Sequence, residues 1–269
     1  RKSHRYIRRW KTRLSRRERK INHCGGKRVR IIENTKIALD TYKMILQPTG
    51  PESEKLKALV PGQFINIKIE GFYLRRPISI ADWDDESLII IYKVVGKGTK
   101  ALSQMETGIA LDILWPLGNG YNLTWIPNSS ILIGGGVGVP PMYGLAKKLV
   151  ETGKKPRIIL GFREKNQVFY DEEFRKLGLE VTVYTEDGSY GEKGFVTNGF
   201  DQAEYVCACG PERMLEAIYR KAQDGQYSFE ARMACGFGGC MGCSCETLVG
   251  NKRICKEGPV LLHKELLWK

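Results

Sequence analysis

The residues best suited to carry chemistry are cysteines that gather in a glycine-rich stretch near the C-terminus. Cys235, Cys240 and Cys243 have the spacing C-x4-C-x2-C, and Cys255 follows after eleven intervening residues. The first three positions have the spacing of a plant-type [2Fe–2S] cluster, in which four thiolates converge on two irons. The interspersed glycines allow left-handed backbone and bring amide N–H groups close to the sulfurs. The sequence therefore predicts a one-electron carrier held by these four cysteines.

Two other interpretations of the cysteines compete with the iron–sulfur cluster. Disulfides are disfavoured because no apolar signal sequence precedes them and because the chain is much longer than a disulfide scaffold requires. Zinc also binds four thiolates and is the main alternative. Zinc ribbons, however, usually place their cysteines in two separate knuckles, whereas three share one loop here. Cys245 lies in the same loop and is expected not to be a ligand.

A second candidate site is a glycine loop in the middle of the chain. The apolar run 131–133 leads into Gly134-Gly135-Gly136-Val137-Gly138 and then into an expected helix. Such a turn lets the backbone approach a pyrophosphate and points a helix N-terminus at it. Pro140 and Pro141 interrupt the usual G-x-G-x-x-G pattern, so an ordinary tight turn is the competing interpretation.

The run Cys209-Gly210-Pro211 strengthens the nucleotide interpretation because it also follows an expected strand. Both loops would then lie at the carboxyl ends of parallel strands, where ligands bind in such sheets. Taken alone, Cys209 is explained equally well as a small buried apolar residue.

The first half of the chain contains a third candidate site, Leu74-Arg75-Arg76-Pro77-Ile78-Ser79-Ile80. Two arginines beside a serine suit a diphosphate and a polarised ring system, since Arg offers charge-assisted contacts and Ser a hydroxyl donor. A basic surface turn is the alternative. Gly96-Lys97-Gly98-Thr99 precedes a short expected helix, and its backbone amides could also hold phosphate.

Two different patterns of secondary structure must position these motifs. Before residue 127, closely spaced β-like runs without a long helix predict an antiparallel barrel or sandwich. These runs cover 29–33, 41–47, 64–69, 88–95 and 111–115. After residue 127, strands alternate with helices and predict an open, doubly wound parallel sheet. The expected strands are 131–133, 157–161, 180–185 and 204–208, and the expected helices are 142–152, 169–177 and 212–224. The cysteine-rich end forms a third, small unit.

Charge is distributed very unevenly along the 269 residues. The net charge is +13, but residues 1–30 hold 14 Lys or Arg and one acid, which leaves 29 basic and 29 acidic residues in the remainder. The excess therefore lies within the first 30 residues, mostly in the arm 1–26, and the body of the protein gives no nucleic-acid signal. Three interpretations of the arm stay open: a leader or expression-derived segment outside the functional protein, a dock for an acidic partner, or a nucleic-acid or membrane contact. No apolar run approaches a membrane span, and the thiolate site suits the cytoplasm.

Taken together and in this order, the motifs resemble those of the ferredoxin–NADP reductase superfamily, most closely the electron-transfer subunits of NAD-linked (type B) dihydroorotate dehydrogenase. The resemblance covers the chain from about Arg28 to its end. It implies an antiparallel FAD-binding β-barrel over 27–127, an NAD-binding α/β domain over 128–230 and a [2Fe–2S] segment over 231–269. The arm 1–26 does not resemble that family.

The resemblance also implies roles for individual residues. For FAD, these are Arg76 and Ser79 as contacts, Pro77 and Ile78 at the ring, and Gly98 and Thr99 at the diphosphate. For NAD, these are Gly135, Gly136 and Gly138 at the pyrophosphate and Cys209 near the nicotinamide. For the cluster, the ligands are Cys235, Cys240, Cys243 and Cys255.

The implied activity is electron transfer from the FMN of a separate dihydroorotate-oxidising catalytic subunit, through [2Fe–2S] and FAD, to NAD. Membership of a heterotetramer is implied by the resemblance as well. The alternative is a related flavin and iron–sulfur subunit of an NADH-dependent ferredoxin–NADP oxidoreductase or a sulfide dehydrogenase. A zinc-containing binding protein is the hypothesis from another class. The choice between NAD and NADP stays open because Glu164, Glu186 and Asp187 cannot be assigned to a ribose from sequence.

Overall fold

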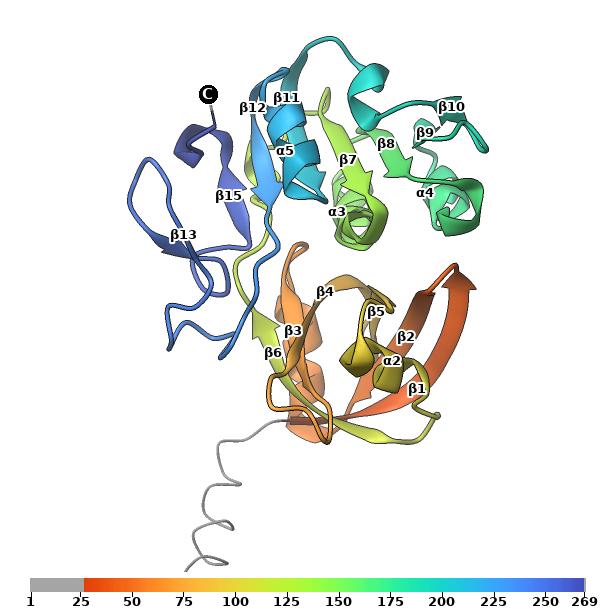
Figure 1. The fold of residues 1–269 in the computed structure, drawn as a ribbon, viewed down its shortest axis with the longest axis vertical. Helices are drawn as coiled ribbons and strands as arrows, with labels where there is room; N and C mark the ends of the chain where they lie inside the picture. The colour runs from red at the N-terminus through yellow and green to blue at the C-terminus, as the bar shows by residue number, and fades with distance from the viewer. Residues whose placement is uncertain (1–26, 269) are drawn as a thin grey trace, which may run out of the picture.

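The computed structural model describes residues 27–268, which form a β-barrel, an α/β sheet above it and a small cysteine-rich unit beside the two (Figure 1). This arrangement confirms the predicted fold class. The basic arm 1–26, with its candidate helix, lies outside the described residues. None of the helices between residues 27 and 268 has the length and apolar character needed to span a bilayer.

The barrel is closed and antiparallel, with the strand order β1-β2-β5-β4-β3-β6. Its strands are β1 (Lys27–Ala38), β2 (Thr41–Pro48), β3 (Phe64–Lys68), β4 (Arg76–Trp83), β5 (Leu88–Lys93) and β6 (Ala110–Leu117). A 3₁₀ segment, η1 (Gly50–Ala58), and one helix, α2 (Lys97–Ser103), fill the connections. Inward-facing Ile and Leu side chains make the core, among them Ile31, Leu46, Ile65, Ile80 and Ile113. Alternation of buried and partly exposed positions along β2 and β6 explains why these sequences form strands of a barrel.

The sheet has seven strands in the order β10-β9-β8-β7-β11-β12-β15, and all pairs are parallel except the last. Its strands are β7 (Ile131–Gly135), β8 (Arg157–Phe162), β9 (Val181–Thr185), β10 (Glu192–Lys193), β11 (Ala203–Cys209), β12 (Ala222–Ser228) and β15 (Val260–Leu262). The helices are α3 (Val139–Glu151), α4 (Asp171–Lys176) and α5 (Glu212–Tyr219). The 3₁₀ segments are η2 (Leu123–Trp125), η3 (Gly136–Gly138), η4 (Lys165–Gln167), η5 (Val196–Gly199) and η6 (His263–Glu265).

The prediction of one long helix over 212–224 is wrong. Helix α5 ends at Tyr219, and the chain re-enters the sheet as β12, beside β11. Tyr227 is fully buried there. Pairing with β11 and burial of the strand outweigh a helical pattern that local sequence alone would continue.

The cysteine-rich unit packs against the sheet and is hydrogen-bonded to its edge strand. Strands β13 (Ser244–Cys245) and β14 (Lys252–Arg253) form a small hairpin, and β15 pairs antiparallel with β12. Cys243 and Cys255 are buried in the same hydrophobic cluster as Ile133 and Tyr227 of the sheet. Packing against the sheet therefore fixes two of the four candidate ligands.

The barrel and the sheet are in direct contact through β4 and α3. A Cβ on Gly144 would lie 2.6 Å from the carbonyl oxygen of Ala81, so glycine permits this close approach. Nearby, the Lys147 ammonium lies 2.9 Å from the Asp82 carboxylate. Tyr121, in the segment that connects the two parts, is buried and donates a hydrogen bond to the Ala208 carbonyl oxygen at 3.1 Å. These contacts fix the orientation of the barrel edge against the carboxyl ends of the sheet strands.

Candidate functional site

The glycine loop and the Cys209-Gly210-Pro211 turn lie side by side because β7 and β11 are neighbouring parallel strands. Gly134 and Cys209 are register partners, and each strand ends within a residue of that pair. The two motifs therefore meet at the carboxyl edge of the sheet, which is the place expected for a dinucleotide.

The three predicted nucleotide-loop glycines have different surroundings. A Cβ on Gly138 would lie 2.1 Å from the Cys209 carbonyl oxygen, and one on Gly135 would lie 2.4 Å from the Met214 sulfur. Gly136 has a φ of +52° and open space around its Cα. Gly135 and Gly138 thus permit the close packing of the two turns, whereas Gly136 leaves backbone open toward a ligand.

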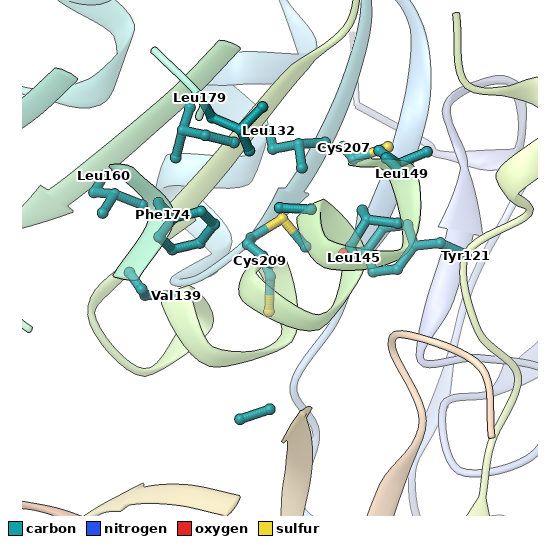
Figure 2. Close-up of a cluster of buried hydrophobic side chains, with 14 of the residues drawn as sticks. Tyr121, Leu132, Val139, Leu145, Leu149, Leu160, Phe174, Leu179, Cys207 and Cys209 are labelled. Atoms are coloured by element: carbon teal, nitrogen blue, oxygen red, sulfur yellow. The ribbon is translucent and has the colours of Figure 1, made fainter. Parts of the chain in front are cut away.

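Cys209 is buried, in agreement with both interpretations of its role. Figure 2 shows it with Cys207 in the cluster of buried side chains that includes Leu145 and Tyr121. Burial raises the pKa of the Cys209 thiol to about 12, and the nearby Glu230 carboxylate acts in the same direction. The thiol is therefore neutral at physiological pH. It can pack against a ring, but it is not an activated nucleophile.

On the barrel side, Arg76 is held in place by its neighbours. Its guanidinium carbon lies 5.0 Å from the centre of the Phe72 ring, and the group donates to the Leu74 carbonyl oxygen. The guanidinium also covers Gly98, where a Cβ would lie 2.4 Å from Nε. Thr99 accepts hydrogen bonds from the amides of Val95 and Gly96, so its hydroxyl caps α2. Arg76 and the start of α2 therefore meet at one point.

A cleft of about 320 Å³ runs between the barrel and the sheet and collects most of these residues. The predicted residues on its wall are Arg76, Pro77, Ile78, Ser79, Thr99 and Cys209. Gly98 and the three nucleotide-loop glycines are not among its lining residues. The Ser79 hydroxyl has no hydrogen bond within residues 27–268, which leaves it free for a ligand. The barrel strand β4, Val137 in the loop after β7 and the end of β11 thus contribute to a single cavity.

Several residues that line this cleft carried no signal in the sequence. They are Tyr92, Val95, Ser228, Phe229, Glu230 and Met233. Glu230 remains accessible to solvent, yet surrounding protein atoms displace enough water to raise the pKa of its carboxyl. These residues belong to the strand ends of β5 and β12, and only the closed topology brings them to the motifs.

The four predicted cluster cysteines come together in the structure as two pairs. Cys240 is near enough to Cys235 to lower the pKa of its thiol, and Cys243 is near enough to Cys255 to raise the pKa of its thiol. The charge of Cys235 also acts to raise the pKa of Cys255. Cys243 and Cys255 are buried, Cys235 is half-buried and Cys240 is exposed. Cys245 is half-buried on β13, next to the buried pair.

Backbone amides surround the sulfurs. Burial opposes ionisation of Cys235, but hydrogen bonds from the amides of Phe237, Gly239 and Cys240 lower the pKa of that thiol to about 6. The Gly239 nitrogen lies 3.2 Å from the Cys235 sulfur, and the Cys255 nitrogen lies 3.4 Å from the Cys243 sulfur. Burial, with the neighbouring Cys243, raises the pKa of Cys255 to about 12. N–H groups aimed at sulfur suit a negatively charged iron–sulfur cluster.

The paired geometry bears on the choice between zinc and iron. Two facing pairs of thiols match a cluster in which each of two irons takes two protein sulfurs. The residues present therefore fit a [2Fe–2S] cluster better than one tetrahedral zinc ion.

The cysteine loop is anchored at several points outside the thiols. Arg253 donates to the Gly238 carbonyl oxygen at 2.6 Å and forms an ion pair with Glu257. Asn119, in a turn whose sequence gave little functional signal, donates to the carbonyl oxygens of Glu257 and Val260 at 2.9 and 3.1 Å. The connection between barrel and sheet thus also supports the cysteine unit.

Two family models match the chain. Residues 230–267 match the iron-sulfur cluster binding domain of dihydroorotate dehydrogenase B, and residues 132–220 match an oxidoreductase NAD-binding domain. The chain is 43% identical over 265 residues to the dihydroorotate dehydrogenase B (NAD⁺) electron transfer subunit of Fusobacterium nucleatum, with 92% of this chain and 98% of that protein covered. It is 39% identical to the protein of the same name from Shouchella clausii, with 87% and 95% covered.

Solved structures give the same architecture. A structure of the NADH-dependent reduced ferredoxin-NADP oxidoreductase superposes with a TM-score of 0.78 at 29% identity, covering 89% of this chain and 90% of that one. The Amycolatopsis cytochrome P450 reductase GcoB superposes with a TM-score of 0.62 at 20% identity, covering 72% and 66%, and shows likeness of fold alone. These comparisons confirm the family predicted from the motifs.

Proposed function

Because the chain belongs to the family of dihydroorotate dehydrogenase B (NAD⁺) electron transfer subunits, we propose that it carries electrons from a dihydroorotate-oxidising subunit to NAD⁺. It is an oxidoreductase subunit that uses an iron–sulfur cluster, FAD and NAD. The observation that carries the proposal is that the cysteine loop packs against barrel strand β3 while the barrel and the sheet share a cleft.

When bound, the cluster and the flavin together convert single electrons into the hydride that nicotinamide accepts. The partner in this proposal is an FMN-containing catalytic subunit that oxidises dihydroorotate in pyrimidine biosynthesis, assembled with this chain as a heterotetramer. The name of the relatives, which describes a subunit, supports a catalytic partner. The seven cysteines between residues 27 and 268 are free of disulfides, which supports our placing the complex in the cytoplasm.

For FAD, the residues of the barrel would bind and orient the cofactor. Arg76, seated over Gly98, would pair with the diphosphate, and the amides at Gly98 and Thr99 would add donors. Pro77 and Ile78 would line the ring. The free hydroxyl of Ser79 would donate to it from the floor of the cleft.

For NAD, the carboxyl edge of the sheet would bind the pyrophosphate and the nicotinamide. Gly136 would present backbone N–H groups, while Gly135 and Gly138 keep the two turns close together. Cys209 would pack against the nicotinamide as a neutral thiol and exclude water from the space beside it.

For the cluster, Cys235 and Cys240 would bind one iron, and Cys243 and Cys255 the other. The exposed Cys240 side would face the partner, and the buried pair would face the sheet. We assign FAD binding to residues 27–127, NAD binding to 128–230 and the cluster to 231–269, with the arm 1–26 outside these functions.

The test is the composition and reactivity of the purified chain. The proposal predicts one FAD and two irons with two acid-labile sulfides per chain, and bleaching of the visible spectrum on addition of NADH. NADPH serves as the control nucleotide. A colourless protein that contains one zinc ion would refute the proposal, and faster bleaching by NADPH would refute the NAD assignment.

A further inference from the structure

A buried amide lies at the boundary between the barrel and the cysteine loop. Asn66 sits in the middle of β3, is 1% exposed and pairs across the sheet with Pro77 of β4. Pro77 and Phe64, two residues before Asn66, both line the cleft assigned to FAD. Asn66 is therefore one strand away from the residues that would contact the flavin.

The other side of Asn66 faces the cysteine loop. Its amide nitrogen lies 3.5 Å from the carbonyl oxygen of Cys235, a long hydrogen bond. A Cβ on Gly236, where φ is +78°, would lie only 2.2 Å from that nitrogen. The loop thus closes directly onto the Asn66 amide, and glycine at position 236 is what makes this contact sterically possible.

Half of the hydrogen-bonding capacity of this amide is unused. Within residues 27–268, the Asn66 side-chain oxygen is buried and has no hydrogen-bond partner. A buried polar atom without a partner is destabilising, and an apolar side chain of similar size would avoid that cost. Simple packing therefore does not explain an asparagine here, whereas the contact of its N–H end with the Cys235 backbone does.

The strand that carries Asn66 is held firmly. Arg75 donates to the Asn66 carbonyl oxygen at 3.4 Å and to that of Asp112 at 3.0 Å, and it also lies 2.9 Å from the Asp112 carboxylate. This bracing fixes the backbone at Asn66, and the contacts of its amide nitrogen with Cys235 and Gly236 orient the side chain toward the loop.

We propose that Asn66 is a positioning residue that seats the Cys235 loop against the flavin-binding strand and raises the reduction potential of the bound [2Fe–2S] cluster. The inference rests on the proposed function, since it requires a cluster in the loop. The N–H end of the amide meets the backbone of the ligand Cys235, so its positive end lies beside the site and favours the reduced form, which carries one more negative charge. Removal of the amide dipole lowers the potential.

The experiment is an EPR-monitored redox titration of the full chain with FAD and cluster bound. Asn66→Leu removes the dipole and keeps a side chain of similar volume. We expect it to retain FAD and iron, to show a cluster potential shifted to more negative values and to alter the EPR line shape. Asn119→Ala is the matched control, because Asn119 also joins the cysteine unit to the rest of the chain but contacts residues 257–260 instead of Cys235. We expect that variant to melt earlier with an unchanged potential.

Each outcome separates the inference from the proposed function. An unchanged potential in Asn66→Leu, or an equal shift in Asn119→Ala, would overturn the inference alone. A wild-type chain without a cluster would overturn the proposed function and this inference together. If Asn66→Leu does not fold, Asn66→Ala is titrated in its place and is judged by the same two results.

Discussion

Replacing Gly98 with alanine tests whether the packing of Arg76 against the start of α2 orients its guanidinium to bind the FAD diphosphate. The new Cβ would lie 2.4 Å from Arg76 Nε, 2.6 Å from Nη2 and 2.7 Å from Cζ. These atoms are the far end of a flexible side chain, so the barrel can accept the methyl group while the guanidinium must move. Gly98 lies within the helix, where alanine is favoured over glycine by about 1 kcal/mol. Gly98→Ala should therefore leave the apoprotein as stable as before or slightly more so.

The expected loss appears in FAD binding instead. A hydrogen bond to a charged group is worth about 1.5–3 kcal/mol, and each 1.4 kcal/mol changes a dissociation constant tenfold. Displacing Arg76 should thus weaken FAD binding by about 10- to 150-fold. Arg76→Ala should give a loss in the same range. The double variant should be no weaker than Arg76→Ala alone, because both changes remove the same contact.

The assay is FAD affinity measured by flavin fluorescence on refilling the apoprotein, together with thermal unfolding. Gly96→Ala is the matched control, since Gly96 is extended at φ −174° and a Cβ added there would have no atom within 4 Å. That variant should bind FAD like the unchanged chain. Wild-type FAD affinity in Gly98→Ala, or losses that add in the double variant, would refute the reasoning.

Three further predictions follow from the site. Cys240→Ser should lose or destabilise the cluster while Cys245→Ser keeps it, as measured by iron and acid-labile sulfide; full cluster content in Cys240→Ser would contradict the ligand assignment. Gly138→Ala places a Cβ 2.1 Å from a backbone oxygen, and this overpacking should destabilise the fold by about 1–3 kcal/mol. The variant should therefore bind NADH more weakly and have a lower Tm. Calorimetry that finds the NADH affinity and the Tm unchanged would contradict this prediction. The Arg253 ion pair lowers the pKa of Glu257 from 4.5 to about 2, so its stabilising effect is present above pH 4.5 and lost as pH falls toward 2. Because the ion pair is exposed to solvent, the Tm difference between wild type and Glu257→Gln should be small. That difference should shrink as the pH falls. A difference that grows on acidification would contradict the ion-pair account.

Local sequence was sufficient for much of the fold. The alternation along 41–47 and 111–115 predicted barrel strands, and strand–helix alternation after residue 127 predicted the parallel sheet. Local sequence was insufficient at 76–83, where Pro77 and Asp82 hide the strand pattern and pairing with β3 and β5 makes the segment a strand. It was also insufficient at 222–228, where pairing with β11 makes the segment a strand instead of a helix. Closure of the barrel itself depends on contacts between β1 and β6, which are far apart in sequence.

Residues of the candidate site could be predicted where they lie within a single sequence motif. The cysteine spacing identified four thiols that the structure brings together, and the cleft contains Arg76, Ser79 and Cys209. Glu230 and Asn66 could not be predicted, because each acts across a boundary between elements and stands in no motif. Their environment exists only after β12 and β3 have been placed against the cysteine unit.

The most direct test of the central claim is dihydroorotate-dependent reduction of NAD⁺ by this chain copurified with its native catalytic partner. The partner alone with NAD⁺ is the control. Our account predicts NADH formation in the complex and none with the partner alone. A complex that contains flavin and iron, whose flavin is reduced by NADH, but which forms no NADH from dihydroorotate would contradict the account and assign the chain to a different electron donor.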